Sequence, residues 1–250
     1  MKKNSLSPDF KYKLFKITER LYCIEMPNPY DLAMLFVRYQ EYYESPNKDV
    51  RNKAFDLEQY MRWYSVNNKN HRYEDKSHMS FSYPIDFCGF NIPSYAITNI
   101  LLKSEYVGSL NMYDALMRKI YNDIMDDIGR TCNGSFYLIG TPKMQSSTMM
   151  HEIAHGLYYL NSTYYIVANK LISDHLTKSE IKVFKKVLKD YHYAKEVMYD
   201  EIQAYLSTGE MIKQFPDVDN KPFQKHFKEY YKDIKPKLIP KKVGDSDLIS

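Results

Sequence analysis

The sequence predicts a helix-rich α+β fold with a small mixed sheet. Three observations predict this class. The 250 residues include only 8 glycines, which favours long helices over glycine-rich turns. Several segments carry apolar residues at helical spacing, and only two short apolar runs have the boundaries of strands. Helices combined with a few strands are typical of α+β domains.

The two expected strands are "RLYCIEM" at 20–26 and "SFYLIGT" at 135–141. Pro27 ends the first, and Gly134 and Pro142 bound the second. Both runs are short, so the sheet they predict is small.

The expected helices are marked by a 3.6-residue apolar period or by capping residues. Thr177 and Glu180 have the spacing of a capping box, and Gly129 and Gly209 follow segments that they can terminate. Ser146, Ser147 or Thr148 can cap the helix that runs to about Tyr159. The other expected helices cover residues 30–45, 55–66, 112–128, 162–176, 177–189, 194–209 and 221–234.

No repeat or glycine-serine linker divides the chain, so we expect a single domain over residues 1–250. The sequence does not indicate the architecture of the amino-terminal part, residues 1–130. Residues 131–210 form the expected zinc-binding core, which carries the histidine motif described below. Residues 67–95 are polar and then rich in proline and glycine, which predicts a long surface loop. The first sixteen and last fifteen residues are expected to be loosely attached ends.

Composition and charge exclude several classes of protein. The net charge of +4 is small and evenly spread, so no nucleic-acid partner is expected. No apolar run approaches the roughly 20 residues of a transmembrane helix, so no membrane association is expected. The basic start lacks an apolar segment behind it, which predicts a cytoplasmic protein, although signal-less export would leave no trace. Cys23, Cys88 and Cys132 are expected to be free thiols.

The most informative stretch is His151-Glu152-Ile153-Ala154-His155. Residues four apart lie on one face of a helix, so both histidines can hold one metal ion. Glu152 lies about 100° around the helix from His151, where it can border the ion and act as a general base. This spacing is typical of zinc peptidases, in which zinc activates a water molecule.

An ordinary helix that carries two histidines is the plain alternative. Met149, Ile153 and Leu157 make the helix apolar on several sides and therefore predict its burial. Buried histidines without partners are costly, so metal coordination is favoured. Tyr158 and Asn161 occupy positions that would be glycine and histidine in a metzincin, which excludes that class.

A catalytic zinc usually has three protein ligands, so a third ligand is needed. The best candidate is Glu201 in "YDEIQAYL", on a second strong helix. Small residues in both helices, Ala154 and Gly156 in the first and Ala204 in the second, would allow a close approach. The competing ligands are Asp200, Glu196, Asp174 and His175, with Cys132 in "GRTCNGS" less favoured.

The stretches "HEIAHGLYY" and "DEIQAY" together resemble the gluzincin superfamily of zinc metallopeptidases, over roughly residues 135–208. The resemblance implies a zincin-like core with an active-site helix, a peptide or protein substrate, and an edge strand near "SFYLIGT" that binds it. By the resemblance His151, His155 and Glu201 would be zinc ligands and Glu152 the general base. Tyr205 stands where thermolysin-like members have Asp, so Asp200 is the candidate to orient a histidine.

Tyr205 is also our first candidate for the donor that stabilises the oxyanion, because it follows Glu201 by one helical turn. A packed helix tyrosine is the plain interpretation of the same residue. The alternative donors are Tyr159, Tyr164, His175 and His192. The isolated histidines His71, His78 and His226 lie on polar segments and are expected to be exposed.

The leading hypothesis is therefore a zinc metallopeptidase, a hydrolase. The alternative is a non-enzymatic interaction protein with a structural or degenerate metal site, which predicts a fourth protein ligand. A third hypothesis, nucleic-acid binding through the Lys/Tyr-rich carboxy-terminal third, is weaker. Substrate preference, endo- or exopeptidase action and oligomeric state are not encoded in these motifs.

Overall fold

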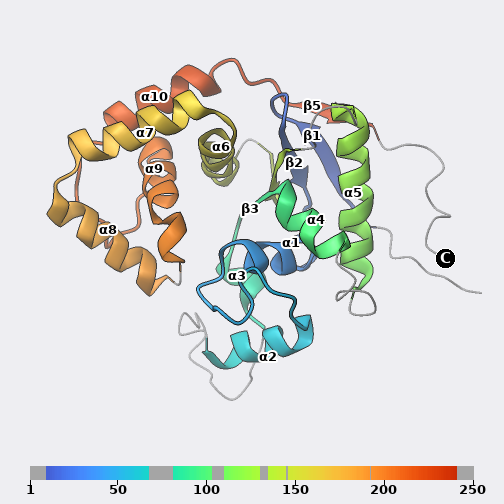
Figure 1. Ribbon diagram of the computed structural model, residues 1–250. Coiled ribbons are helices and arrows are strands. Elements are labelled where there is room, and N and C mark those ends of the chain that lie inside the picture. Colours follow the sequence, from blue (N-terminus) through green and yellow to red (C-terminus); the bar gives the residue numbers. More distant parts are fainter. Residues whose placement is uncertain are drawn as a thin grey trace, which may run out of the picture.

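The computed structural model describes residues 10–67, 81–102, 110–129, 135–144, 146–191 and 193–240. Its core is a five-stranded mixed sheet with helices on both faces (Figure 1). This confirms the helix-rich α+β class and the small mixed sheet. The predictions for residues 68–80 of the expected loop, and for His71, His78, Cys132 and His192, lie outside the described residues. Cys23 and Cys88 are free thiols.

The sheet has the strand order β3-β4-β2-β1-β5. The strands are β1 (Lys13–Lys16), β2 (Leu21–Glu25), β3 (Phe90–Pro93), β4 (Tyr137–Thr141) and β5 (Lys237–Ile239). β2 and β4 pair in parallel, with Leu21 opposite Tyr137, and all other pairs are antiparallel. The predicted strands at 20–26 and 135–141 are therefore confirmed as β2 and β4.

The predicted helices are present with small shifts of their ends. In chain order the helices are α1 (Pro29–Glu44), α2 (Leu57–Asn67), α3 (Tyr83–Asp86), α4 (Ser94–Leu102), α5 (Met112–Ile128), α6 (Ser147–Leu160), α7 (Ser162–His175), α8 (Lys178–Asp190), α9 (Met198–Thr208) and α10 (Lys221–Tyr231). A short 3₁₀ turn, Lys195–Val197, leads into α9. The expected capping box opens α8, and Gly209, with φ of 75°, ends α9 in the left-handed conformation.

Both faces of the central strands are buried, which explains why they read as continuous apolar runs. Tyr22 and Ile24 of β2 point into a core that includes residues of α1, α4 and α5. The alternate residues Leu21 and Cys23 point to the other face, into a core that includes residues of α6. A third core is formed by residues of α7 to α10. Helix α6 therefore lies between the sheet and α9 (Figure 1).

The prediction of a long surface loop at 67–95 is wrong for the part of this segment that the structure describes. Residues 83–86 form α3, residues 90–93 form the fully buried strand β3, and α4 begins at Ser94. β3 has only four residues and ends in Pro93, which suits a strand paired on one side. Its burial comes from contacts with α1 and α6 rather than from a local pattern, so the sequence alone did not indicate it.

The prediction of loosely attached ends is also wrong in part. β1 pairs with β2, and β5 brings the carboxy-terminal segment back to the outer edge of β1, with Phe15 opposite Leu238. The lysines in these two segments hid the strands, because lysine is depleted in β-strands in general. Of the two, only β5 is an edge strand, since β1 is paired on both sides.

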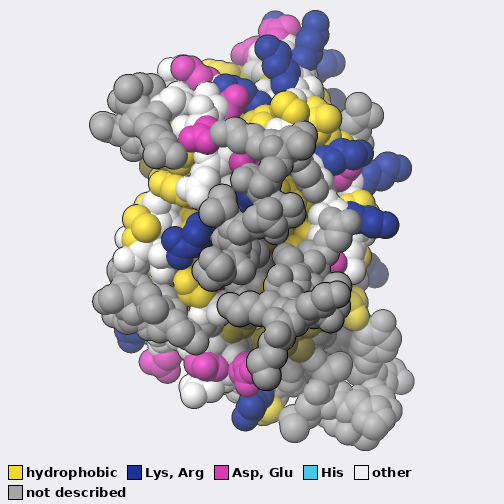
Figure 2. All heavy atoms as spheres, turned by 90° about the vertical axis from the view of Figure 1, so that its right-hand side faces the viewer, with side chains coloured by type: hydrophobic (Ala, Val, Ile, Leu, Met, Phe, Trp, Pro, Cys, Tyr) yellow, Lys and Arg dark blue, Asp and Glu magenta, His cyan; other side chains and the backbone are white. Residues whose placement is uncertain are grey.

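Charges of both signs are interspersed on the face that carries α5 and β5 (Figure 2). Lys16 lies 2.7 Å from Asp127, and Lys119 lies 3.4 Å from Asp123 on α5. The mixture of charges on this face agrees with the even distribution of charged residues along the sequence. The absence of a nucleic-acid partner stays a prediction. In the part of the chain that the structure describes, no helix combines the length and apolar character needed to cross a bilayer.

Candidate metal centre

The candidate site lies between α6 and α9, two helices that pack against each other. Ala154 and Ala204 are fully buried there, and Gln203 Nε2 donates a hydrogen bond to the Ala154 carbonyl oxygen at 3.3 Å. Small residues thus contribute to the close approach, as expected. Gly156 does so elsewhere: a Cβ at this position would lie 2.5 Å from Leu21 Cδ1, so this glycine lets α6 approach the sheet instead.

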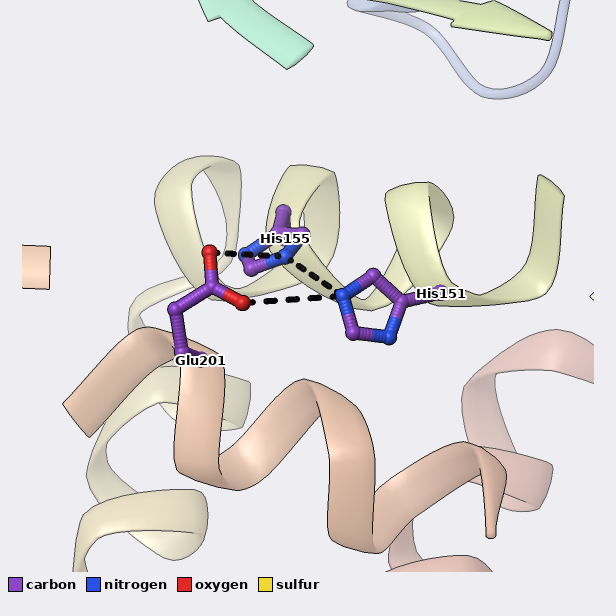
Figure 3. Close-up of side chains that lie close together, drawn as sticks. All are labelled: His151, His155 and Glu201. Atoms are coloured by element: carbon purple, nitrogen blue, oxygen red, sulfur yellow. Dashed lines mark hydrogen bonds and ion pairs between the residues drawn. The ribbon is translucent and has the colours of Figure 1, made fainter. Parts of the chain in front are cut away.

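Three predicted ligands converge in this interface (Figure 3). The Nε2 atoms of His151 and His155, one helical turn apart on α6, lie 3.1 Å from each other. Glu201 reaches across from α9, with Oε1 3.5 Å from His155 Nε2 and Oε2 3.7 Å from His151 Nε2. All three residues are buried, with exposed fractions of 7%, 2% and 2% for His151, His155 and Glu201.

The donor set fits a zinc ion. Zinc bonds of about 2.0–2.1 Å in a tetrahedral arrangement place neighbouring donor atoms about 3.3 Å apart. The two Nε2 atoms lie 3.1 Å apart, and each has a different oxygen of Glu201 at 3.5 or 3.7 Å, so the separations are close to that value. Glu201 Oε2 is also buried without a hydrogen-bond partner among the described residues. Because a buried carboxylate oxygen without a partner is costly, a cation at this point would stabilise the arrangement.

The competing ligands lie elsewhere. Glu196 is exposed and pairs with Arg51, 2.5 Å away. Asp174 and His175 are exposed at the end of α7. Asp200 is close to the cluster but on the far side of the His155 ring. Of the described candidates, Glu201 is therefore the one whose carboxylate faces both histidine Nε2 atoms.

Asp200 has the position expected of a group that orients a histidine. Its Oδ1 lies 2.9 Å from His155 Nδ1, the ring nitrogen that faces away from Glu201. Burial alone would lower the pKa of His155, but the neighbouring charges of Asp200 and Glu201 raise it well above its usual value. A metal ion would displace the proton from Nε2, and the acceptor at Nδ1 would keep the other proton there, so that Nε2 is the ligand atom.

Asp200→Asn is expected to weaken metal binding by about tenfold, since loss of a carboxylate partner behind a ligating histidine typically costs 10–100-fold. A competition titration with a chromogenic zinc chelator measures the change. Glu196→Gln, four residues earlier and exposed, is the control and should bind as the unmodified chain does. Equal affinities for the Asp200→Asn and Glu196→Gln variants would show that Asp200 does not orient a ligand.

Glu152 faces β3 from α6. Asn91 Nδ2 donates a hydrogen bond to Glu152 Oε2 at 2.8 Å, and the backbone at Gly89 lies close to the other oxygen. A Cβ at Gly89 would come within 2.3 Å of Glu152 Oε1 and 2.7 Å of Thr148 Cγ2. Burial raises the pKa of Glu152 although His151 and His155 favour its charged form. A raised pKa brings a carboxylate closer to the range in which a general base works efficiently at neutral pH.

Several residues of the site were not predicted. Asn91 and Gly89 fall in the segment expected to be a surface loop. Glu210 follows Gly209, and its Oε2 lies 3.8 Å from His151 Nδ1 after the left-handed turn. Glu44 of α1 is influenced by the cluster, because burial and the nearby charge of Glu201 raise its pKa. No local pattern marked these four residues, although Gly209 was identified as the end of its helix.

Tyr205 lies beside the cluster. Its ring packs edge-on against the His151 ring with the centroids 4.6 Å apart, and its hydroxyl is 3.4 Å from the Tyr193 hydroxyl. Of the alternative donors, Tyr164 donates to Gln203 Oε1 at 3.0 Å, and Tyr159 packs on Tyr137. The structure therefore places Tyr205, rather than Tyr159 or Tyr164, against a candidate ligand.

His226 was expected to be exposed, which is wrong. It is buried on α10, where its ring stacks on the Tyr164 ring with the centroids 4.7 Å apart. Its Nε2 is 3.3 Å from the Tyr164 carbonyl oxygen. Phe223 and Phe227 share its helical face, so the apolar period of α10 could have indicated its burial.

Comparison with known proteins adds no assignment to this geometry. No protein-family model matches the chain. Neither curated proteins nor solved structures match it. The resemblance to gluzincins and the zincin-like core therefore stay predictions, and the functional argument depends on the arrangement of the side chains.

Proposed function

We propose that this chain is a zinc-dependent peptidase in which His151, His155 and Glu201 hold the ion and Glu152 is the general base. The observation that carries the proposal is the convergence of three buried donors at spacings that suit one zinc ion. A fourth buried group, the Glu152 carboxylate, borders them without belonging to the donor set. The resemblance to gluzincins supports the same roles.

Each residue has a defined task in this proposal. When bound, zinc would polarise the substrate carbonyl and acidify a water molecule. Glu152 would accept the proton of the attacking water and deliver it to the leaving amine, while Asn91 holds its carboxylate in place. Tyr205 would donate a hydrogen bond to the carbonyl oxygen as negative charge develops on it. Asp200 would keep His155 in the tautomer that binds the metal.

The alternative of a structural metal site predicts a fourth protein ligand. Among the described residues, the cluster has three donor residues. Glu210 is the nearest further carboxylate to His151, but it faces Nδ1 and not the Nε2 atom that points to the other ligands. Three protein ligands and an open position are typical of catalytic rather than structural zinc, which favours the enzymatic proposal.

Metal content tests the proposal directly. The purified chain is expected to hold about one zinc ion, as measured by elemental mass spectrometry. His151→Ala should lose the ion, whereas His175→Ala, which alters an exposed histidine on α7, should keep it. The zinc-loaded chain should also cleave members of a peptide library and lose this activity after chelation. A chain that holds no zinc, or retains it equally in both variants, would contradict the proposal.

A further inference from the structure

A pocket of about 360 Å³ lies among α1, α2, the end of α3 and the part of the chain from Tyr191 to Ile212, which includes α9. This volume lies within the range of pockets that enclose small ligands. Aromatic side chains dominate its wall. Tyr60, Trp63 and Tyr64 contribute from α2, and Tyr193 and Tyr205 contribute from the segment before α9 and from α9 itself.

The pocket adjoins the candidate metal centre. Tyr205 belongs to both, because it lines the pocket and its ring packs 4.6 Å from the His151 ring. Tyr193, also in the wall, has its hydroxyl 3.4 Å from that of Tyr205. A side chain held in the pocket would therefore belong to a residue close to the bond that is cleaved.

The charged groups in the wall are acidic. Glu41 and Asp86 line the pocket, and no lysine, arginine or histidine does so among the described residues. Glu41 is buried and accepts a hydrogen bond from Tyr83 at 3.0 Å. Burial raises the pKa of Glu41 even though hydrogen bonds from neighbouring hydroxyl groups favour its charged form. Asp86 accepts a hydrogen bond from Tyr64 at 2.9 Å.

The end of α1 adds negative potential to the same wall. Ser45, the C-cap residue of α1, lines the pocket together with Glu41 from its last turn. That turn contains no basic residue, so no side chain of α1 itself offsets the negative end of the helix dipole there. A positive charge in the pocket would offset both the dipole and the buried carboxylate.

We propose that this pocket receives a long cationic side chain of the substrate, arginine in preference to lysine, next to the cleaved bond. The inference rests on the proposed peptidase function. Aromatic faces attract cations, and a planar guanidinium can stack on them while it donates to carboxylates, which an ammonium group cannot do as well. The combination of aromatic walls with Glu41 and Asp86 thus selects for charge as well as for length.

Trp63 gives a direct signal for binding, because it is the only tryptophan in the chain and it lines the pocket. Nα-acetylarginine amide is expected to produce a saturable change in tryptophan fluorescence. Nα-acetylcitrulline amide, which has the same shape without the charge, should bind at least about tenfold more weakly. Equal binding of the two amides, or tighter binding of Nα-acetylphenylalanine amide, would overturn the proposal.

Substitutions of the pocket carboxylates test whether the fluorescence change comes from binding in this pocket. Asp86→Asn and Glu41→Gln should each weaken binding of the arginine amide several-fold. Glu58→Gln is the matched control, because Glu58 lies on α2 with Trp63 but is exposed and does not line the pocket. Circular dichroism and zinc content confirm that each variant is folded, and Asp86→Asn remains the test if Glu41→Gln does not fold. Unchanged binding in a folded Asp86→Asn variant would overturn the role of its carboxylate.

Cleavage assays separate this inference from the proposed function. Peptide pairs that differ only by arginine or citrulline beside the cleaved bond should differ at least about tenfold in kcat/KM. Cleavage without this preference and without a fluorescence response would overturn the pocket assignment and leave the peptidase proposal standing. A charge-selective fluorescence response without cleavage of any peptide by the zinc-loaded chain would support a cation pocket but overturn the peptidase proposal and the pocket's role as a substrate site.

Discussion

Glu152→Gln is expected to keep the zinc ion and to lower peptide hydrolysis by about 10²–10⁴-fold, the usual contribution of a general base. Glutamine has the shape of glutamate and can still accept the hydrogen bond from Asn91 Nδ2, so the fold around α6 and β3 should be preserved. It cannot take up a proton from the attacking water. Steady-state cleavage of a library-derived peptide, measured together with metal content, tests both parts.

The control for this experiment is Glu229→Gln, which removes an exposed carboxylate from α10 and should leave hydrolysis unchanged. If the Glu152→Gln variant retained full activity with zinc bound, the assignment of the base would be wrong. If it lost zinc as well, Glu152 would act as a ligand or as a structural residue. The two readouts therefore distinguish a proton-transfer role from a role in holding the ion.

Glu201→Gln is expected to weaken zinc binding by about 3 kcal/mol, on the order of a hundredfold, and to lower hydrolysis with it. The physical reason is that the ion loses an anionic oxygen at a buried point where the remaining donors are neutral imidazoles. Isothermal titration with zinc at fixed pH measures the affinity. Glu201 is 2% exposed, so solvent cannot replace the missing charge without local opening.

Glu210→Gln is the matched control for this substitution. Its carboxylate is also close to His151, at 3.8 Å, but it faces the Nδ1 nitrogen and is partly exposed. We expect its zinc affinity to change much less than that of Glu201→Gln. The reverse order of effects would show that Glu210, and not Glu201, is the third ligand.

Much of the fold was predictable because local patterns determine it. The capping box at Thr177 and Glu180 and the left-handed Gly209 fixed helix ends that the structure confirms. β1, β3 and β5 were missed because short strands with lysine or proline gain their stability from partners distant in sequence. α4 was missed for a related reason, since it begins directly after β3, in the segment taken for a loop.

For the candidate site, too, the features set by local patterns were predictable, and those set by tertiary packing were not. The helical spacing of His151 and His155, and the pairing of Ala154 with Ala204, were enough to predict that Glu201 would approach both histidines. The contacts of Asn91 with Glu152 and of Glu210 with His151 depend on how β3 and the turn after α9 are placed by tertiary packing. Such contacts leave no periodic signal in the sequence.

Because α6 lies between two hydrophobic cores, a metal ion bound to it would affect the stability of the whole fold. His151 and His155 belong to a helix packed on the sheet, while Glu201 is followed by Ile202 and Leu206, which pack in the core of α7 to α10. One ion held by all three would act as a cross-link between these cores. Its binding free energy would add to the folding free energy, so zinc availability would set the stability of the folded chain as well as its chemistry.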